Sequence, residues 1–164
     1  MKKILILGGG FGGVFLAKKL YKASKSIFDI ELISDNNYFV FQPLLPEVAS
    51  GAINAEDAVS PLRMLLKGVK FRNAEIKEIN LKSRKVLVLQ GFRKRSHWLN
   101  FDHLVIALGQ ESNLDIVKGL RDHAFTIRNL KEFSLKKNTI KSNALFSHKV
   151  ETVMDPSTLC FFLP

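Results

Sequence analysis

The sequence holds a single cysteine, Cys160, so it forms no internal disulfide and contains no CxxC pair. This excludes dithiol–disulfide chemistry within the chain and makes a reducing, cytoplasmic setting the natural one. No apolar run approaches the roughly 20 residues that a membrane-spanning helix needs. We expect no export signal either, because the apolar stretch after Lys2 and Lys3 ends at glycines instead of a cleavage site.

Acidic residues and clustered metal ligands are also scarce. Lys and Arg number 25 against 15 Asp and Glu, which gives a formal net charge of +10. This excess suits a phosphate-bearing ligand, anionic lipid or nucleic acid, and it says nothing about the fold. The four histidines lack the close spacing of a zinc site, so we expect no metal. With 46% apolar and 24% charged residues, the 164-residue chain can form one globular domain.

The first 34 residues follow the pattern of a strand, a turn, a helix and a second strand. Residues 3–7 are apolar and predict a buried strand. Apolar residues then recur at helical spacing between Val14 and Tyr21, and the segment 28–34 (FDIELIS) predicts the second strand. This order within about 30 residues predicts a βαβ unit with parallel strands.

The middle of the chain predicts a loop, a short helix and several strands. The loop NNYFVFQPLLPEVASG is rich in aromatics and proline, and such loops on a rigid scaffold often contact ligands. The segment SPLRMLLKG predicts a helix with Ser60 as N-cap, Pro61 at its first position and Gly68 at its end. Residues 69–91 predict an antiparallel hairpin with LKSR as its turn, and residues 103–109 predict a further buried strand.

A basic cluster, Arg93, Lys94 and Arg95, falls on a predicted hairpin tip. Such a cluster is more often a solvated turn than a binding site, and contact with lipid or nucleic acid is the alternative. Beyond about residue 121 the pattern weakens. We therefore expect one domain over residues 1–130 and a poorly specified tail over 131–164, helical at first and then irregular.

Gly8, Gly10 and Gly13 form a GxGxxG motif between the first predicted strand and the helix. The first glycine permits a tight turn, the second lets the backbone approach a pyrophosphate, and the third lets helix and strand pack closely. The N–H groups of the first helical turn then face the phosphates. This context favours dinucleotide binding over a merely glycine-rich turn.

Dinucleotide sites of this kind usually carry an acidic residue about 20 residues after the motif, where it binds a ribose. Asp35 is the candidate, 22 residues after Gly13. Glu31 is also acidic, but it lies in the middle of a predicted strand. An Asx turn before Asn36 and Asn37 is the alternative role for Asp35, and both readings stay open.

Four stretches occur together in a recognisable order and spacing: ILILGGGFGG, NNYFVFQPLLPEVASG, SPLRMLL and FDHLVIALG. Over residues 2 to about 130 the chain resembles the N-terminal part of the type II NADH dehydrogenases. These are single-subunit NADH:quinone oxidoreductases of the pyridine nucleotide-disulfide oxidoreductase-like superfamily. The resemblance implies an α/β fold, namely a Rossmann-like FAD-binding domain with a parallel sheet and an antiparallel β-meander.

The resemblance also implies that the glycine motif holds FAD. The implied cofactor-binding residues are Gly8, Gly10, Phe11, Gly12 and Gly13 at the pyrophosphate, Asn36, Asn37, Gln42 and Pro43 along the flavin, Ile76 at the adenine, and Ala107 and Gly109 at a strand end. Ser34 stands where many relatives carry the ribose acid, which shifts the carboxylate to Asp35. Leu108 replaces the threonine of the usual ATG motif at that strand end, which removes a hydroxyl group. The resemblance assigns no catalytic residue.

In such relatives NADH gives a hydride to the flavin, and a quinone is then reduced. They continue with a second GxGxxG motif for NADH, which this sequence lacks, so we expect a chain truncated before the NAD-binding domain, with little activity alone. The implied partners are NADH and quinone, with no specific nucleic acid. The net charge is compatible with weak, peripheral association with an anionic surface at the cytoplasmic face of the inner membrane. The alternative is a small Rossmann-type nucleotide-binding module or sensor without catalysis.

Overall fold

The computed structural model describes residues 1–24, 27–110, 113, 115–116, 118–119, 124–126 and 160–162. Its elements are β1 (Lys2–Leu7), α1 (Phe11–Ser24), β2 (Phe28–Ser34), β3 (Tyr38–Val40), η1 (Gln42–Leu44), α2 (Leu45–Ser50), η2 (Ala55–Ala58), β4 (Val59–Pro61), α3 (Leu62–Leu65), β5 (Lys70–Asn80), β6 (Lys85–Gln90), β7 (Arg95–Asn100), β8 (His103–Ile106), β9 (Ala124–Thr126) and β10 (Cys160–Phe162). The 3-10 helices are labelled η.

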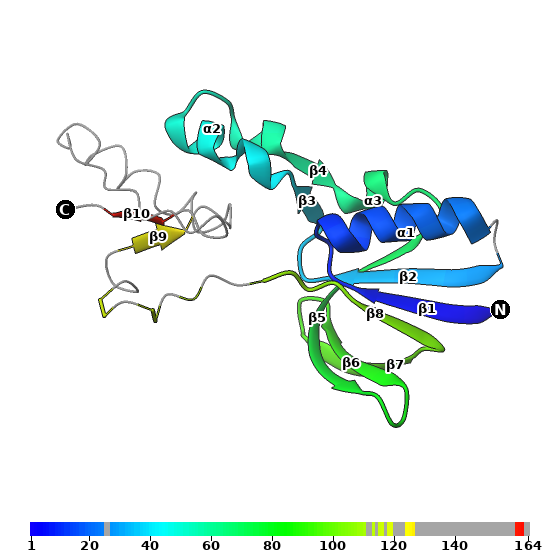
Figure 1. The fold of residues 1–164 in the computed structure, drawn as a ribbon. Helices are drawn as coiled ribbons and strands as arrows, with labels where there is room; N and C mark the ends of the chain where they lie inside the picture. The colour runs from blue at the N-terminus through cyan, green and yellow to red at the C-terminus, as the bar shows by residue number, and fades with distance from the viewer. Residues whose placement is uncertain are drawn as a thin grey trace. The chain divides into compact units, whose positions relative to one another are not determined.

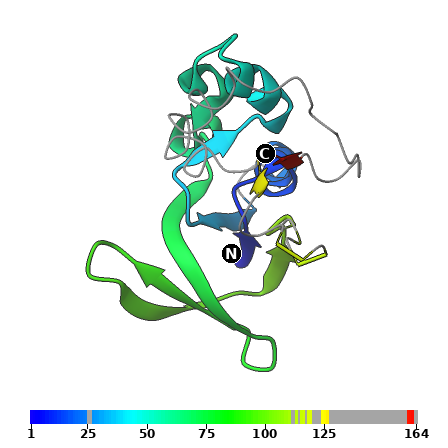
Figure 2. The same ribbon diagram turned by 90° about the vertical axis from the view of Figure 1, so that its left-hand side faces the viewer.

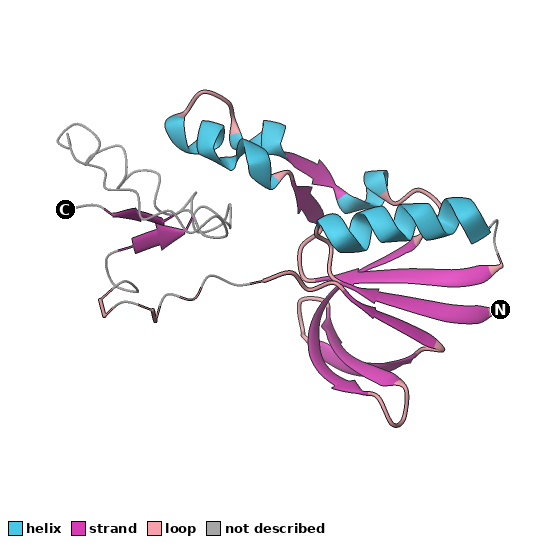
Figure 3. Cartoon of the chain, in the orientation of Figure 1, coloured by secondary structure: helices cyan, strands magenta, loops and turns pink. Residues whose placement is uncertain are grey.

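A six-stranded sheet in the order β7-β6-β5-β2-β1-β8 forms the centre of the first part of the chain (Figure 1). β1 pairs in parallel with β2 and β8, and β2 pairs in parallel with β5. β5, β6 and β7 then pair antiparallel as a meander. The colouring by secondary structure in Figure 3 separates these strands from the long helix α1. This arrangement confirms the predicted α/β class with a parallel sheet and an antiparallel meander.

The two faces of the parallel strands carry different layers, because successive side chains of a strand point to opposite faces. Ile4, Ile6 and Leu32 pack on one face with Val14 and Ala17 of α1. Figure 2 shows the green β5–β6–β7 strands projecting away from the parallel strands. The residues of the second cluster lie on the meander side: Leu5, Leu7, Ile33, Ala74, Val86, Val88 and Phe101. α1 and the meander therefore cover opposite faces of β1 and β2.

The predicted helix at SPLRMLLKG is shorter than expected. Ser60 does not cap it, because Ser60 lies in β4 and pairs with Phe39 of β3. Helix α3 covers only Leu62–Leu65, and its N-terminal flanking residue is Pro61, which makes no side-chain cap. Gly68 follows with a φ of 85°.

The predicted strand at 103–109 is wrong in its length and burial. β8 ends at Ile106 and is the edge strand of the sheet. The side chain of Ile106 is 59% exposed.

The chain divides into two compact units, residues 1–40 with 59–109, and residues 41–58 with 110–164. In the second unit, η1 leads into α2, which ends at Gly51 in a left-handed conformation. β9 and β10 of the same unit form an antiparallel pair. Most of the tail expected over 131–164 lies outside the described residues, so the boundary at residue 130 stays a prediction. None of the described helices is both long and apolar enough to cross a bilayer.

Candidate functional site

The turn between β1 and α1 is too closely packed for side chains at two of its glycines. Gly8 has a φ of 112°, and a Cβ there would lie 2.1 Å from the carbonyl oxygen of Ala107. A Cβ on Gly13 would lie 2.0 Å from the carbonyl oxygen of Gly8. The Gly8 N–H donates to the carbonyl of Ile33 at 2.8 Å, which ties the turn to the end of β2. Gly8 and Gly13 are therefore required by close backbone packing within the protein.

Gly10 differs, because a Cβ built on it meets no atom within 4 Å. It faces open space immediately before the first turn of α1, which contains no acidic residue. A helix N-terminus presents N–H groups and a partial positive charge, so this position suits an anionic group. The ring of Phe11, in the first turn, packs edge-on against Phe39 with centroids 4.9 Å apart. The open Gly10 and the close-packed Gly8 and Gly13 together fit the cradle of a pyrophosphate.

The exit of β2 forms a second part of the candidate site. The hydroxyl of Ser34 accepts the N–H of Asn36 at 3.3 Å, and the exposed Asp35 accepts the side-chain amide of Asn36 at 3.2 Å. The amide of Asn73 on β5 donates to the carbonyls of Ser34 and Asp35, at 3.0 and 2.9 Å. The side chain that accepts a backbone N–H within this turn is therefore that of Ser34. The carboxylate of Asp35 therefore lies at the surface, on a turn held from the neighbouring strand.

The structure also brings the end of β8 to the glycine turn. The Ala107 N–H donates to the carbonyl of Leu7 at 2.8 Å, and the Ala107 Cβ lies 3.8 Å from a Cβ built on Gly12. Gly109 has a φ of 80° and open space around it, and the intervening Leu108 is exposed. The strand end VIALG therefore packs against the β1–α1 turn.

Three predicted site residues lie elsewhere in the chain. Ile76 pairs with Val88 at an irregularity of β5, and its side chain packs against the meander-side cluster. Gln42 and Pro43 are exposed on η1, in the second unit. Their predicted contacts with adenine and flavin stay predictions. Asn37 accepts the N–H of Leu62 at 3.0 Å and so fixes the start of α3.

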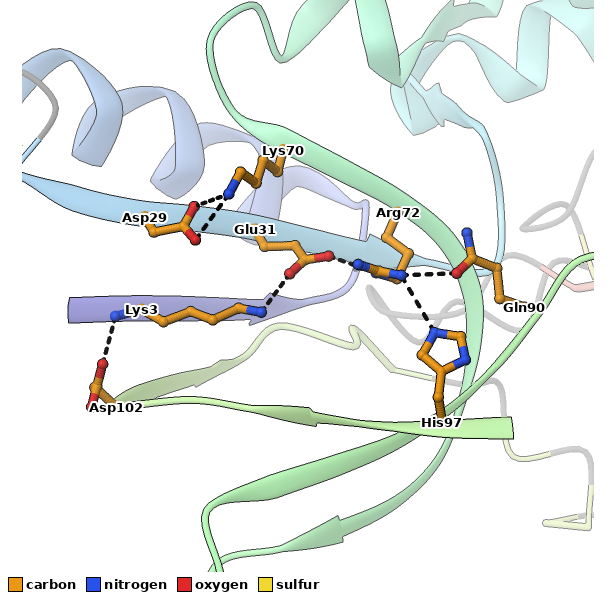
Figure 4. Close-up of polar contacts among 8 residues, drawn as sticks. All are labelled: Lys3, Asp29, Glu31, Lys70, Arg72, Gln90, His97 and Asp102. Atoms are coloured by element: carbon orange, nitrogen blue, oxygen red, sulfur yellow. Dashed lines mark hydrogen bonds and ion pairs between the residues drawn. The ribbon is translucent and has the colours of Figure 1, made fainter. Parts of the chain in front are cut away.

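A buried carboxylate lies in the middle of β2, on the face of the sheet that the meander covers (Figure 4). Glu31 is 3% exposed, and its carboxylate contacts Lys3 at 2.8 Å and Arg72 at 2.5 Å. Arg72 also donates to Gln90 at 2.9 Å, and its guanidinium lies 3.3 Å from Nε2 of His97. Glu31 is therefore committed to the sheet, which leaves Asp35 as the candidate ribose acid.

Two opposing effects set the pKa of Glu31. Burial raises this pKa, but hydrogen bonds from Lys3 and Arg72 and their positive charges outweigh the burial and lower it below its ordinary value. On the same face, the hydrogen bond from Lys70 to Asp29 raises the pKa of Lys70. Both shifts mean that the folded chain favours the charged form of the group, the carboxylate of Glu31 and the ammonium of Lys70. Among the described residues, no group of three or more His, Cys, Asp or Glu side chains is placed to hold a metal ion.

The family model described as pyridine nucleotide-disulphide oxidoreductase matches residues 2–149. The chain belongs to this family. The type II NADH:quinone oxidoreductases of Staphylococcus haemolyticus (strain JCSC1435) and Staphylococcus aureus (strain NCTC 8325 / PS 47) are 37% and 38% identical to it over 132 residues. In both cases the match covers 79% of this chain and 31% of the relative, so this family member spans about a third of the length of those relatives.

Solved structures agree with this membership. The NDH2 structure from Plasmodium falciparum in complex with NADH matches with a TM-score of 0.73 at 26% identity, over 88% of this chain and 30% of that one. The sulfide:quinone oxidoreductase of Aquifex aeolicus matches with a TM-score of 0.74 over 89% of this chain and 33% of that one. At 24% identity, the second similarity supports the fold alone.

Sequence reasoning missed Asn73 and the structural role of Ser34 in the candidate site of this family member. Asn73 holds the β2 exit turn, and Ser34 supplies the hydroxyl inside it. A Cβ on Gly9 would lie 2.7 Å from that hydroxyl, so the second of the three consecutive glycines also has a packing reason. The run of three glycines in the sequence was the available signal for this close approach.

Proposed function

We propose that this chain forms the FAD-binding part of a flavoprotein NADH:quinone oxidoreductase. The observation that carries the proposal is the open space at Gly10, before the first turn of α1, beside a turn in which Gly8 and Gly13 leave no room for side chains. A backbone cradle of this kind lets a pyrophosphate approach the N–H groups closely. The names of the Staphylococcus relatives supply the proposed substrates, NADH and quinone.

Each part of FAD has proposed partners in this chain. The β1–α1 turn would hold the pyrophosphate through backbone N–H groups, and Asp35 would accept the ribose hydroxyls. The remaining proposed contacts are Phe11 and Gly12 at the phosphates, Asn36, Asn37, Gln42 and Pro43 along the flavin, Ile76 at the adenine, and Ala107 and Gly109 at the strand end.

When bound, FAD supplies the redox chemistry, which is acceptance of a hydride from NADH followed by two-electron reduction of a quinone. The protein contributes position and electrostatics, and much of the rate depends on holding NADH against the flavin. This sequence contains one GxGxxG motif and no second one for NADH. We therefore expect weak flavin retention and no NADH oxidation by the chain alone.

The deciding experiment is to purify the chain, record its visible flavin absorbance and titrate FAD by calorimetry. Gly10→Asp places a carboxylate where the phosphates would lie and should abolish FAD binding. Ser83→Asp makes the same charge change at an exposed residue of the β5–β6 turn and should leave FAD binding unchanged. Equal FAD affinities of the two variants would contradict the proposed phosphate site. NADH-dependent quinone reduction by the chain alone would contradict the expected inactivity.

A nucleotide-binding module or sensor without catalysis is the second candidate, favoured by the single glycine motif. Thermal melting with FAD and with NAD separates the two candidates. Preferential stabilisation by FAD supports the flavoprotein, and preferential stabilisation by NAD supports the sensor.

The proposal also includes a place in the cell. The single cysteine favours a cytoplasmic setting. The net charge of +10 favours a weak, peripheral association with the anionic cytoplasmic face of the inner membrane.

A further inference from the structure

We propose that the turn between β6 and β7 is the surface through which this chain contacts an anionic phospholipid bilayer. This turn and its first strand residue, Gly91–Arg95, are called the Phe92 tip below. The inference rests on the membrane association proposed above and assigns it to one surface. It does not depend on bound FAD.

The side chain of Phe92 is fully exposed, because it lies in the turn between β6 and β7. Its side chain is 105% exposed, so nothing in the described chain covers the ring. The N–H of Lys94 donates to the carbonyl of Gly91 at 3.0 Å and closes the turn, while Lys94 adopts a φ of 45°. The ring is thus presented at the end of a hydrogen-bonded hairpin. Phenylalanine on a basic surface is typical of segments that enter the membrane interface.

Positive charge gathers on the same strands. The segment 70–100 holds nine Lys and Arg against two Glu, and so carries +7 of the net +10. Three consecutive cations, Arg93, Lys94 and Arg95, follow Phe92 directly and are exposed. The carboxylate of Glu75 lies 3.8 Å from Lys94 of the tip and 2.6 Å from Lys77. Lys77 offsets this carboxylate, so the tip keeps a net positive charge of three.

The shape of the tip favours a bilayer over nucleic acid. Proteins that hold single strands stack successive bases on several aromatic rings along a basic groove. The Phe92 tip offers one ring on a projecting turn. A bilayer needs only an apolar group that enters the interface and cations that remain at the headgroups.

The turn between β5 and β6 provides a charge-matched control within the same meander. Its residues Lys82 and Arg84, with Lys85 of β6, also carry three cations, and Leu81 is 67% exposed. The two turns lie at opposite ends of β6. A hydrogen bond joins the control turn to the residue after β7, because the carbonyl of Arg84 accepts the N–H of Phe101 at 3.1 Å.

The test is co-sedimentation of the full chain with vesicles of phosphatidylcholine and phosphatidylglycerol in equal parts, against vesicles of phosphatidylcholine alone. Neutralising Arg93, Lys94 and Arg95 to Gln should weaken partitioning into anionic vesicles by about 100-fold, since each basic residue near the surface contributes about fivefold. The matched triple change of Lys82, Arg84 and Lys85 to Gln should weaken it by less than about tenfold, because those charges lie away from the contact. Equal losses for the two triple variants would overturn the assignment while leaving membrane association itself intact.

The apolar contribution has its own measurement. Phe92→Ser should weaken partitioning by about tenfold, and Leu81→Ser should leave it nearly unchanged. Phe92→Trp in a Trp98→Phe background should show a blue-shifted emission on adding anionic vesicles. An unshifted emission from vesicle-bound protein would contradict the proposal.

Two further outcomes reject the inference. If the unaltered chain does not bind anionic vesicles, membrane association and this assignment fail together, while the flavin titration still decides the redox part. A short single-stranded DNA is titrated in parallel with the same variants. If the Phe92-tip triple variant loses DNA affinity but keeps its vesicle affinity, the tip is a nucleic-acid contact.

Discussion

Arg72 Nε lies 2.5 Å from Oε1 of Glu31, between strands whose residues are 41 positions apart in the sequence. The other oxygen of Glu31 lies 2.8 Å from Nζ of Lys3. The carboxylate is buried, whereas both cations keep about a quarter of their side-chain surface exposed. One buried acid therefore joins β1, β2 and β5 on the face of the sheet that the meander covers.

Replacing Glu31 by Gln should lower the free energy of unfolding by about 2 kcal/mol, because it leaves two half-buried cations without their counter-charge. Glu75→Gln is the matched control. It removes a carboxylate from an exposed pair with Lys77 and should change stability little. Urea unfolding of both variants at neutral pH provides the comparison. A loss no larger for Glu31→Gln than for Glu75→Gln would mean that the buried pair does not stabilise the sheet.

The same carboxylate predicts a pH dependence. The folded-state pKa of Glu31 is lowered, so the unfolded chain binds its proton first as the pH falls. The stability from this group is therefore fully present above its ordinary pKa of 4.5 and is lost as the pH falls through the lower folded value. Unfolding experiments from pH 6 downward, at roughly one-unit steps, should show a steeper decline for the unaltered chain than for Glu31→Gln. Parallel curves would contradict the assignment.

The glycines of the β1–α1 turn should respond differently to alanine. Gly13→Ala places a Cβ 2.0 Å from a backbone oxygen and should destabilise the fold by about 2–3 kcal/mol. Gly10→Ala meets open space, so the free energy of unfolding without FAD should stay nearly constant while FAD affinity falls. Chemical unfolding and FAD calorimetry measure the two effects. If Gly10→Ala binds FAD as the unaltered chain does, the open space is not the phosphate site.

Asp35 has two open roles that one substitution separates. As the ribose acid, Asp35→Ala should weaken binding of both FAD and ADP by about tenfold, because a hydrogen bond to a charged group is lost, while FMN, which has no adenosine ribose, is unaffected. As a turn residue only, it would alter stability slightly and leave all three affinities alike. Asp57→Ala, which removes an exposed turn carboxylate that accepts the N–H of Asn54 outside the proposed site, is the control. Calorimetric titration with the three nucleotides distinguishes the roles.

Gly68 combines a left-handed backbone with close packing. Its φ is 85°, and a Cβ there would lie 2.1 Å from the ring of Tyr21. Gly51 has a similar φ of 82° but open space, so Gly51→Ala should cost only about 1 kcal/mol of conformational strain. Gly68→Ala should cost more. In a Tyr21→Ala background the excess should vanish, and a double-mutant cycle by urea unfolding measures it. An excess that persists without Tyr21 would place the strain elsewhere.

Local patterns were enough to predict β1, α1, β2 and the hairpin of β5 and β6, because hydrophobic periodicity and turn residues report on neighbours in sequence. The prediction at Ser60 was wrong because its backbone pairs with Phe39, and that pairing is a long-range contact. The burial expected for β8 was wrong because edge position depends on strand order. In the site, the glycine turn followed from its motif, whereas the role of Asn73 required the register between β2 and β5.

β1 has one partner that is synthesised almost at once and another that is synthesised much later. All of β1 pairs with β2, which is complete once residue 34 has been added. The pairing with β8 begins at Ile4 and His103. Next to it, the backbone N–H of Lys3 donates to the Asp102 carboxylate, and the Asp102 N–H donates to the carbonyl of Lys3. At about 5–20 residues per second, a nascent chain holds the β8 side of β1 unpaired for roughly 3–20 seconds. Until then a strand with four consecutive apolar residues, all buried in the folded sheet, offers an open edge to other nascent chains, which makes this edge the natural place for a chaperone to act during synthesis.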